Sequence, residues 1–399
     1  MKKLTAFLIT LIMLVSSIPV TAMASSAPTV SADSAVLMDG ATGKILYSKN
    51  MNTAYPPAST TKIMTALLTL EKCKLDDVVT VGKKPPLADG SKIYIFEGEQ
   101  LKVKDLLYAM LLCSANDCAE ALAEHIGGSV DQFVVLMNNR AKELGCKNTN
   151  FVNPSGLYDE NHKTSAYDLA LIMQELSKHK EYTEIATTLA YKIQPTNKST
   201  KERPIWNENK LIQKYSQDYY PYCIGSKTGY TVQSMHSYVS AADKDGHKLI
   251  VALVHDTQKT FFPDAIALFN YGYNNYEYVK MFSKGDVVKT YNEKNTNVPL
   301  LASSDFYYLK EKGSSPELKV QLAENNLSVK YFSIGDIVDS ADIYVGGEKV
   351  GKLDLQSGVN HKIDKIIASN YLLSGIILVL FLGTFVLVLI KIRKKKIKS

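Results

Sequence analysis

One segment near the C-terminus limits what this chain can fold into more than any other. Residues 371–390 form a run of 20 residues without a charged side chain. At ~1.5 Å of rise per residue, a helix of that length matches the ~30 Å hydrocarbon core of a bilayer. Cations follow at once, at Lys391, Arg393, Lys394, Lys395, Lys396 and Lys398. Basic residues beside a span favour the cytoplasmic side. The sequence therefore predicts a single-pass protein with a transmembrane helix over 371–390, a basic cytoplasmic tail over 391–399 and an extracytoplasmic body in the cell membrane.

The N-terminus has the pattern of a secretory leader. Lys2 and Lys3 precede an apolar stretch over residues 4–20, and Ala22-Met23-Ala24 has the small-x-small form of a cleavage site. The alternative is an uncleaved membrane anchor. Because small and polar residues follow the apolar stretch, we expect residues 1–24 to be a cleaved signal peptide.

The net charge of +6 comes from the two ends of the chain. The leader contributes two lysines and the tail six cations, with no acid in either, so the residues between them carry a net charge of −2. The basic balance therefore reflects membrane topology. It gives no support to nucleic-acid binding, and no nucleic-acid motif is present.

Cysteine and histidine residues form no recognisable site pattern. The five cysteines (Cys73, Cys113, Cys118, Cys146 and Cys223) have no C-x-x-C spacing. An odd number leaves at least one thiol unpaired in an exported chain, and we expect buried free thiols. The seven histidines lie apart, without a sequence partner for a Ser-His-Asp triad. The sequence therefore predicts no metal site and no cofactor.

Apolar periodicity divides the chain into two kinds of structure. Helical spacing is found over residues 105–112, 117–126 and 165–176, and also from Ser129, a predicted N-cap, to Gly145. Strand-like segments on either side of turn residues predict hairpins over 35–47 and 238–254. Alternation at Leu318, Val320 and Leu322 predicts short strands with turns beyond residue 278, among them a hairpin over 343–350. A helical cluster combined with strands, followed by a β-rich segment, indicates two domains.

A hydroxyl and an amine lie three residues apart at the start of a further expected helix. Residues at i and i+3 share one helix face, so Ser59 and Lys62 can meet. Serine is a weak nucleophile until a base takes its proton, and a neutral lysine can be that base. The helix behind them is expected to pack on the core, because apolar residues follow at helical spacing at Ile63, Ala66, Leu67 and Leu70.

Two further motifs follow in order along the chain. Ser114-Ala115-Asn116 lies 55 positions after Ser59, and Lys227-Thr228-Gly229 lies 113 positions further on. Each motif is weak alone, and a second Ser-x-x-Lys at Ser177 has no apolar helix behind it. The ordered set, with a core helix behind the first motif and strands behind the last, indicates nucleophilic serine catalysis.

With these motifs the chain resembles the low-molecular-mass penicillin-binding proteins, the serine-type D-Ala-D-Ala carboxypeptidases. The resemblance implies an α+β, β-lactamase-like catalytic domain with a helical cluster inserted into a central antiparallel sheet. We assign residues 28–277 to this domain. Residues 278–362 are assigned to a small all-β domain, either a spacer above the bilayer or a partner-binding module, which precedes the transmembrane helix.

The resemblance also implies a role for each motif residue. Ser59 forms an acyl-enzyme with the penultimate D-Ala carbonyl of a peptidoglycan stem peptide. Lys62 activates it as a base whose pKa is lowered by burial and by a second cation, Lys227. Ser114 relays a proton to the leaving amine. The implied substrate-binding residues are Asn116, Lys227, Thr228, Gly229, Tyr230 and Thr231. The backbone N–H groups of Ser59 and Tyr230 form the oxyanion hole, and β-lactam antibiotics are expected covalent inhibitors.

The chain departs from the usual family pattern near the substrate's terminal carboxylate. Tyr230 stands where a histidine is common. A cation that binds the carboxylate is expected shortly before the last helix of the catalytic domain, but Phe261 occupies that position and Lys259 is the only cation nearby. Thr228 and Thr231 are the alternative carboxylate ligands.

Three other functions would use the same acyl-enzyme. A class A β-lactamase needs a glutamate-activated water, and its Glu-x-x-Leu-Asn pattern is absent from the sequence. A penicillin-binding sensor would stay acylated, and with nine residues after Ile390 it would need a signalling partner. A transpeptidase would resolve the acyl-enzyme with an amine. Removal of the terminal D-Ala from stem pentapeptides is the function we expect, and the balance with transpeptidation stays open.

Overall fold

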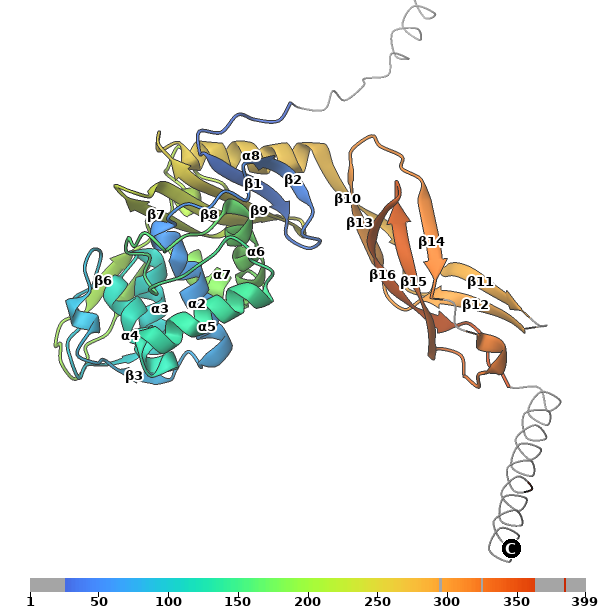
Figure 1. Cartoon of the computed structure of the whole chain (residues 1–399), viewed down its shortest axis with the longest axis horizontal. Coiled ribbons are helices and arrows are strands. Elements are labelled where there is room, and N and C mark those ends of the chain that lie inside the picture. Colours follow the sequence, from blue (N-terminus) through green and yellow to red (C-terminus); the bar gives the residue numbers. More distant parts are fainter. Residues whose placement is uncertain (1–25, 294–295, 324–325, 363–383, 385–399) are drawn as a thin grey trace, which may run out of the picture. The chain divides into compact units, whose positions relative to one another are not determined.

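The computed structural model describes residues 26–293, 296–323, 326–362 and the single position 384 (Figure 1). The predicted signal peptide over 1–24 and the predicted tail over 391–399 lie outside these described residues, as does the predicted span over 371–390 apart from Thr384. A search of the described helices finds none with the length and apolar character to cross a bilayer. The chain divides into two compact units between Glu277 and Tyr278, and each is described by itself.

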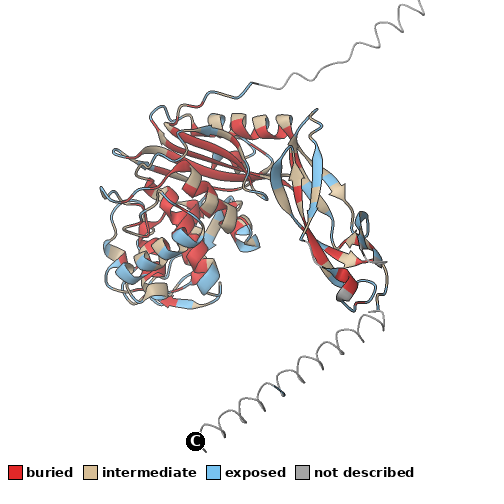
Figure 2. Ribbon diagram, turned by 45° about the vertical axis from the view of Figure 1, so that its right-hand side comes forward, coloured by how far each residue is buried: buried red, intermediate tan, exposed pale blue. Residues whose placement is uncertain are grey.

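The first unit is built on a five-stranded antiparallel sheet in the order β2-β1-β9-β8-β7. These strands are β1 Ser34–Asp39, β2 Ile45–Lys49, β7 Cys223–Thr231, β8 Met235–Lys244 and β9 His247–Asp256. Strand β1 is buried along its whole length, and β8 and β9 are buried at most positions, because helices cover the sheet (Figure 2). The hairpins predicted over 35–47 and 238–254 are confirmed.

A helical cluster is inserted between β2 and β7 (Figure 1). It contains the 3-10 turn η1 Ala58–Thr61 and the helices α2 Lys62–Lys72, α3 Val103–Leu112, α4 Asn116–Gly127, α5 Val130–Glu143, α6 Ala166–Leu176 and α7 Lys180–Ala186. Helix α8 Phe261–Asn275 follows β9. Two short antiparallel strand pairs complete the unit: β3 Val78–Thr80 pairs with β4 Gln100–Lys102, and β5 Ala190–Ile193 pairs with β6 Arg203–Trp206. The unit also contains the 3-10 turns η2 Pro85–Leu87 and η3 Lys210–Ile212. The helices predicted over 105–112, 117–126 and 165–176 and from Ser129 are confirmed to within about two residues, the usual precision of a helix boundary. Ser129 caps α5 by accepting a hydrogen bond from the backbone N–H of Gln132.

Helix α2 lies at the centre of this cluster. Its residues 62–69 are all buried, because α3, α4, α5 and α6 pack around it. The apolar stripe expected for this helix is therefore only part of the buried surface, and Leu70 at its end is half-buried. A helix enclosed on all sides holds the residues at its N-terminus in fixed positions.

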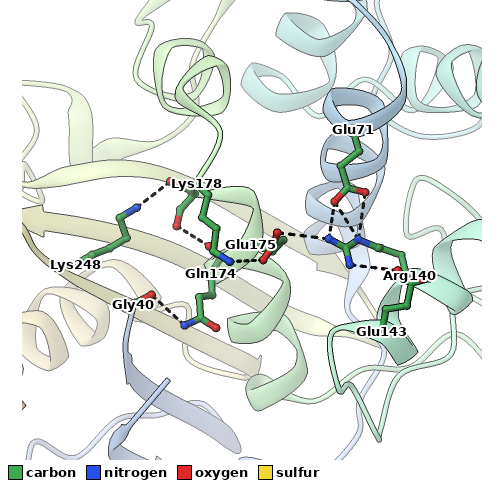
Figure 3. A network of polar contacts seen from close by, with 9 residues as sticks. Gly40, Glu71, Arg140, Glu143, Gln174, Glu175, Lys178 and Lys248 are labelled. Carbon is green, nitrogen blue, oxygen red and sulfur yellow. Dashed lines mark hydrogen bonds and ion pairs between the residues drawn. The ribbon is translucent and has the colours of Figure 1, made fainter. Parts of the chain in front are cut away.

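Ion pairs link α5 and α6 to the C-terminal end of α2 (Figure 3). Arg140 on α5 donates a hydrogen bond from Nη2 to Glu71 Oε1 on α2 at 2.7 Å, and the same nitrogen lies 3.5 Å from Glu175 Oε1 on α6. The side chains of Arg140 and Glu71 are 21% and 23% exposed, so solvent screens this pair less than a fully exposed one. One arginine thus connects three helices.

Over the described residues between 278 and 362, the second unit consists of β-strands and one 3-10 turn. A five-stranded sheet has the order β11-β12-β16-β15-β14, and a two-stranded sheet pairs β10 with β13. The elements are β10 Tyr276–Phe282, β11 Val287–Glu293, β12 Thr296–Ala302, β13 Phe306–Glu311, β14 Leu318–Leu322, η4 Leu327–Val329, β15 Ile337–Val345 and β16 Glu348–Ser357. A separate core includes Val298, Leu300, Ile343, Leu353 and Leu355. The predicted all-β character and the hairpin over 343–350 are confirmed.

Candidate active site

Ser59 lies in the 3-10 turn η1 that leads into α2. The sequence predicts it at the first turn of the helix, and the α-helix itself begins three residues later at Lys62. The expected pairing nevertheless forms, because Lys62 Nζ lies 3.0 Å from Ser59 Oγ. The predicted nucleophile and the predicted base are therefore in direct hydrogen-bond contact.

Strand β7 passes unusually close to this turn. A Cβ atom on Gly229 would lie 2.8 Å from the backbone nitrogen of Ser59 and 2.9 Å from the carbonyl oxygen of Pro57. Only glycine allows that approach without a shift of backbone. The backbone N–H of Ser59 and the strand that carries Tyr230 are consequently held beside each other, as an oxyanion hole requires.

Lys62 is completely buried and has three oxygen neighbours. Its Nζ lies 3.0 Å from Ser59 Oγ, 2.6 Å from Asn116 Oδ1 and 2.6 Å from the carbonyl oxygen of Ser155. Burial, and then the charge of Lys227, lower the pKa of Lys62 well below its usual value. A neutral amine has two N–H groups and one lone pair. Since the amide and carbonyl oxygens can only accept, they take the two N–H groups, and the lone pair faces the Ser59 hydroxyl.

The carbonyl of Ser155 belongs to a loop that sequence reasoning did not connect with the site. This loop, residues 148–164, is tied to α2 by the Thr65 hydroxyl, which donates to the carbonyl oxygen of Pro154 at 2.7 Å. Gly156 has φ +85°, and a Cβ there would lie 1.9 Å from the carbonyl oxygen of Ala58. The loop thus fits against the nucleophile turn only with glycine at this position.

A buried histidine forms a second tie between this loop and the turn. His162 Nδ1 accepts a hydrogen bond from the backbone N–H of Val152 at 3.2 Å. The other ring nitrogen, Nε2, then carries the proton and donates to Thr61 Oγ1 at 2.8 Å. Burial lowers the pKa of His162 to about 4, so the ring is neutral and keeps this arrangement at physiological pH.

The second motif lies where α3 passes into α4. Asn116 is the first residue of α4, and its Nδ2 donates to the carbonyl oxygen of Asp89 at 2.6 Å, which leaves Oδ1 for Lys62. Ser114 has φ +63°, a conformation that is strained for a residue with a side chain. Strained backbone of this kind is common at functional sites. Ser114 fits that pattern, since it lines the same cleft as Ser59.

The third motif lies on β7. Lys227 is buried and donates to the carbonyl oxygen of Thr228 at 3.0 Å. Burial lowers its pKa to about 8, although the charge of Glu208 opposes the shift. Thr228, Gly229 and Tyr230 line the cleft. Thr231 does not join them, because its hydroxyl donates to Ser234 Oγ at 2.7 Å within the turn that follows.

These elements surround an open cleft of ≈ 700 Å³. Its lining residues are Ser59, Ser91, Ser114, Glu208, Thr228, Gly229, Tyr230, His236, Lys259, Phe261 and Phe262. The Tyr230 ring stacks on His236 with centroids 4.5 Å apart, and Phe261 lies 5.7 Å from the same imidazole. Sequence reasoning identified Lys259 and Phe261 near the site but missed Ser91, Glu208, His236 and Phe262, which carry no motif.

The thiols do not form part of this chemistry. All five cysteines are free, three of them buried and two half-buried. Burial raises the pKa of Cys113, directly before Ser114, to about 11, so this thiol is protonated at neutral pH. Among the described residues no group of three or more His, Cys, Asp or Glu side chains is arranged to hold a metal ion.

Comparisons with known proteins give matches for both units. A family model described as D-alanyl-D-alanine carboxypeptidase matches residues 21–258, and one described as the C-terminal domain of penicillin-binding protein 5 matches residues 276–362. The D-alanyl-D-alanine carboxypeptidase DacF of Bacillus subtilis is 36% identical over 292 residues, which cover 71% of this chain and 73% of that protein. DacA of Haemophilus influenzae is 30% identical over 350 residues, 82% and 85% of the two chains.

Solved structures agree with these matches. Penicillin-binding protein 5 from Haemophilus influenzae aligns with a TM-score of 0.68 and 29% identity over 84% of this chain and 99% of that one. A mutant of the Streptomyces K15 DD-transpeptidase aligns with a TM-score of 0.57 and 29% identity over 62% and 99% of the two chains.

Proposed function

The chain belongs to the D-alanyl-D-alanine carboxypeptidase family, and we propose that Ser59, Lys62 and Ser114 carry out the family's reaction in it. The protein is a penicillin-binding D-Ala-D-Ala carboxypeptidase that acts on peptidoglycan stem peptides through a serine acyl-enzyme. The residue roles rest above all on one observation, the 3.0 Å contact between Lys62 Nζ and Ser59 Oγ.

In the acylation step, Ser59 Oγ attacks the carbonyl carbon of the penultimate D-Ala while Lys62 takes the hydroxyl proton. The oxyanion that forms is held by the backbone N–H groups of Ser59 and Tyr230. Losing one such donor typically costs about 2.7–4 kcal/mol of transition-state stabilisation. The C–N bond then breaks, and the departing D-Ala amine receives the proton from Lys62 through Ser114. Attack by water on the ester releases the shortened peptide and restores Ser59.

The substrate backbone is proposed to lie along the exposed edge of β7. Extended peptides pair readily with a free strand edge, and β7 is the edge strand of its sheet. Asn116, at the start of α4, and Lys227, on β7 itself, are proposed to help position the substrate. For the terminal carboxylate we propose Lys259 and Thr228, because both line the cleft. Thr231 is the weaker candidate, since its hydroxyl is already bonded to Ser234.

Labelling with fluorescent penicillin tests the nucleophile. The wild-type chain is expected to form one covalent adduct, located by mass spectrometry on the peptide that contains Ser59, and Ser59→Ala is expected to form none. Ser177→Ala, in the second Ser-x-x-Lys sequence, is the matched control and should label like the wild type. Equal labelling of Ser59→Ala would refute the assignment.

Product analysis separates the alternative fates of the acyl-enzyme. A carboxypeptidase releases D-Ala from a pentapeptide ending in D-Ala-D-Ala. The likeness to a DD-transpeptidase makes transfer to an added amine the second candidate. Acylation without any released D-Ala would instead favour a sensor.

For topology we propose a cleaved signal peptide over residues 1–24, a transmembrane helix over 371–390 and a cytoplasmic tail over 391–399. The support is the charge-free run of 20 residues and the six cations after it. In cells, protease added from outside should digest the catalytic unit, and alkaline carbonate should fail to extract the intact chain. Extraction by carbonate would refute the span.

A further inference from the structure

Two turns in the second unit have the same backbone design. Residues 282–288 read Phe-Ser-Lys-Gly-Asp-Val-Val and residues 332–338 read Phe-Ser-Ile-Gly-Asp-Ile-Val. In each turn the aspartate Oδ2 accepts a hydrogen bond from the serine backbone N–H, at 2.7 Å for Asp286 and 2.8 Å for Asp336. The glycine of each turn has φ +91°. Each turn leads directly into a strand, β11 or β15.

The two turns differ in the residue at the tip. This residue is Lys284 in the first turn and Ile334 in the second. Its backbone N–H is fixed in the same way in both, by Asp305 Oδ1 and by Asn360 Oδ1, each at 2.8 Å. Because a lysine satisfies the same geometry, an isoleucine at the tip is not needed to form the turn.

The second turn exposes an apolar patch, which we call the tip patch. It consists of Tyr331, Ile334 and Ile337, whose exposed fractions are 67%, 63% and 62%. The first turn exposes one large apolar side chain, Val287, beside its lysine. Three large apolar side chains exposed within seven consecutive residues indicate a surface that another apolar medium covers.

The tip patch is joined to the point where the described chain leaves this unit. The backbone N–H of His361 donates to the carbonyl oxygen of Phe332 at 2.9 Å, and the reverse bond measures 3.3 Å. Eight residues separate Lys362 from the apolar run that begins at residue 371. Even a fully extended chain of that length spans only about 28 Å. The described chain therefore leaves the second unit beside the tip patch, and only this short connection separates it from the predicted span.

We propose that the tip patch inserts into the interfacial layer of the bilayer beside the anchor. This inference rests on the proposed transmembrane helix over 371–390. Tyrosine is favoured at the headgroup level, and isoleucine in the adjoining acyl region. The opposite end of β15 provides a contrast, since Leu318 pairs there with Val345. At ~3.3 Å per residue, that end lies about 26 Å along the strand from Ile337.

Tryptophan fluorescence of the full chain in proteoliposomes tests the proposal. The chain has a single tryptophan, Trp206, in the first unit, and Trp206→Phe gives a silent background. On that background Ile334→Trp is expected to emit at shorter wavelength in membranes and to be quenched by lipids with brominated acyl chains. Leu318→Trp, exposed at the other end of the sheet, is the matched control and should be neither shifted nor quenched.

A second pair of variants isolates the tip residue. With Tyr331→Trp as the reporter, adding Ile334→Lys should abolish the quenching while the fold is kept, because Lys284 occupies the same position in the first turn. Circular dichroism and an unchanged calorimetric transition of the second unit check that the variant is folded. Quenching that persists unchanged in Ile334→Lys would overturn the proposal.

The remaining outcomes also decide the question. If the chain floats with vesicles but Ile334→Trp behaves as a water-exposed residue, the tip patch does not touch lipid and the anchor proposal stands. A blue shift that depends on protein concentration and not on brominated lipid would mean that a second copy covers the patch. Failure of the chain to float would refute the anchor and this inference together.

Discussion

At the scale of single residues, the cleft depends on two buried lysines with different tasks. In the proposed mechanism, Lys62 acts as a base and must be neutral, whereas Lys227 acts through its positive charge. Burial lowers the pKa of both, that of Lys62 well below its usual value and that of Lys227 to about 8. Lys62 is neutral while Lys227 is charged only at pH values between the pKa of Lys62 and that of Lys227.

We therefore expect a bell-shaped pH profile for kcat/KM of penicillin acylation, which reports the free enzyme. The rate rises as Lys62 loses its proton and falls above pH 8, where Lys227 loses its charge. Lys227→Arg should remove the alkaline limb, because arginine stays protonated. A profile that is flat from about pH 6 to about pH 11 would contradict a neutral Lys62, since a free lysine titrates near ~10.4.

Glu120, one turn after Asn116 on α4, should tune this profile. Burial, and then the charge of Glu124, raise the pKa of Glu120 to about 7. Its negative charge favours the protonated form of Lys62. Glu120→Gln should therefore lower the pKa of Lys62 and move the acidic limb to lower pH. Glu124→Gln is the control and should shift that limb less, and a shift to higher pH in Glu120→Gln would show that the coupling has the opposite sign.

At the scale of elements, the site is made by the close approach of a 3-10 turn, an edge strand and a loop. Glycines permit two of these contacts, Gly229 against Ser59 and Gly156 against Ala58. Each contact joins the backbones of two separate segments, so the path of the backbone decides it.

Gly156→Ala should be more harmful than the same change at Gly246. Both glycines have φ +85°, so both alanine variants are expected to lose about 1–2 kcal/mol to left-handed strain. A Cβ at Gly246 meets nothing within 4 Å, whereas at Gly156 it would displace the loop that holds Lys62. Denaturant unfolding should show a larger loss for Gly156→Ala, and penicillin acylation should slow in that variant alone. Equal effects of the two variants would mean that the contact with Ala58 is unimportant.

At the scale of the whole molecule, the chain has two separate cores, and every residue proposed for catalysis lies in the first unit. Leu355→Ala in the second core should cost that unit about 2–5 kcal/mol and leave the rate of penicillin acylation unchanged. Leu169→Ala, in the first core, is the matched control. Calorimetry should show that each variant lowers one transition, and that a bound β-lactam raises only the transition of the first unit. A loss of acylation in Leu355→Ala would show that the two units fold as one.

Local sequence predicted the parts of this protein that depend on neighbouring residues. Caps such as Ser129, the apolar spacing behind Ser59 and the strand-like run around Val239 are each visible within a few neighbouring residues. The order of three motifs then predicted the family, and with it the convergence of Ser59, Lys62 and Asn116.

Tertiary structure alone decided the groups around them. Every residue has a carbonyl, so nothing in the sequence distinguishes the one at Ser155 that accepts from Lys62. His236 and Glu208 line the cleft because distant segments meet there, whereas Thr231 turns toward Ser234 because of its local turn. Side-chain type determines what chemistry is possible, but the path of the backbone over long separations determines which groups meet, and that path follows from packing of the whole unit.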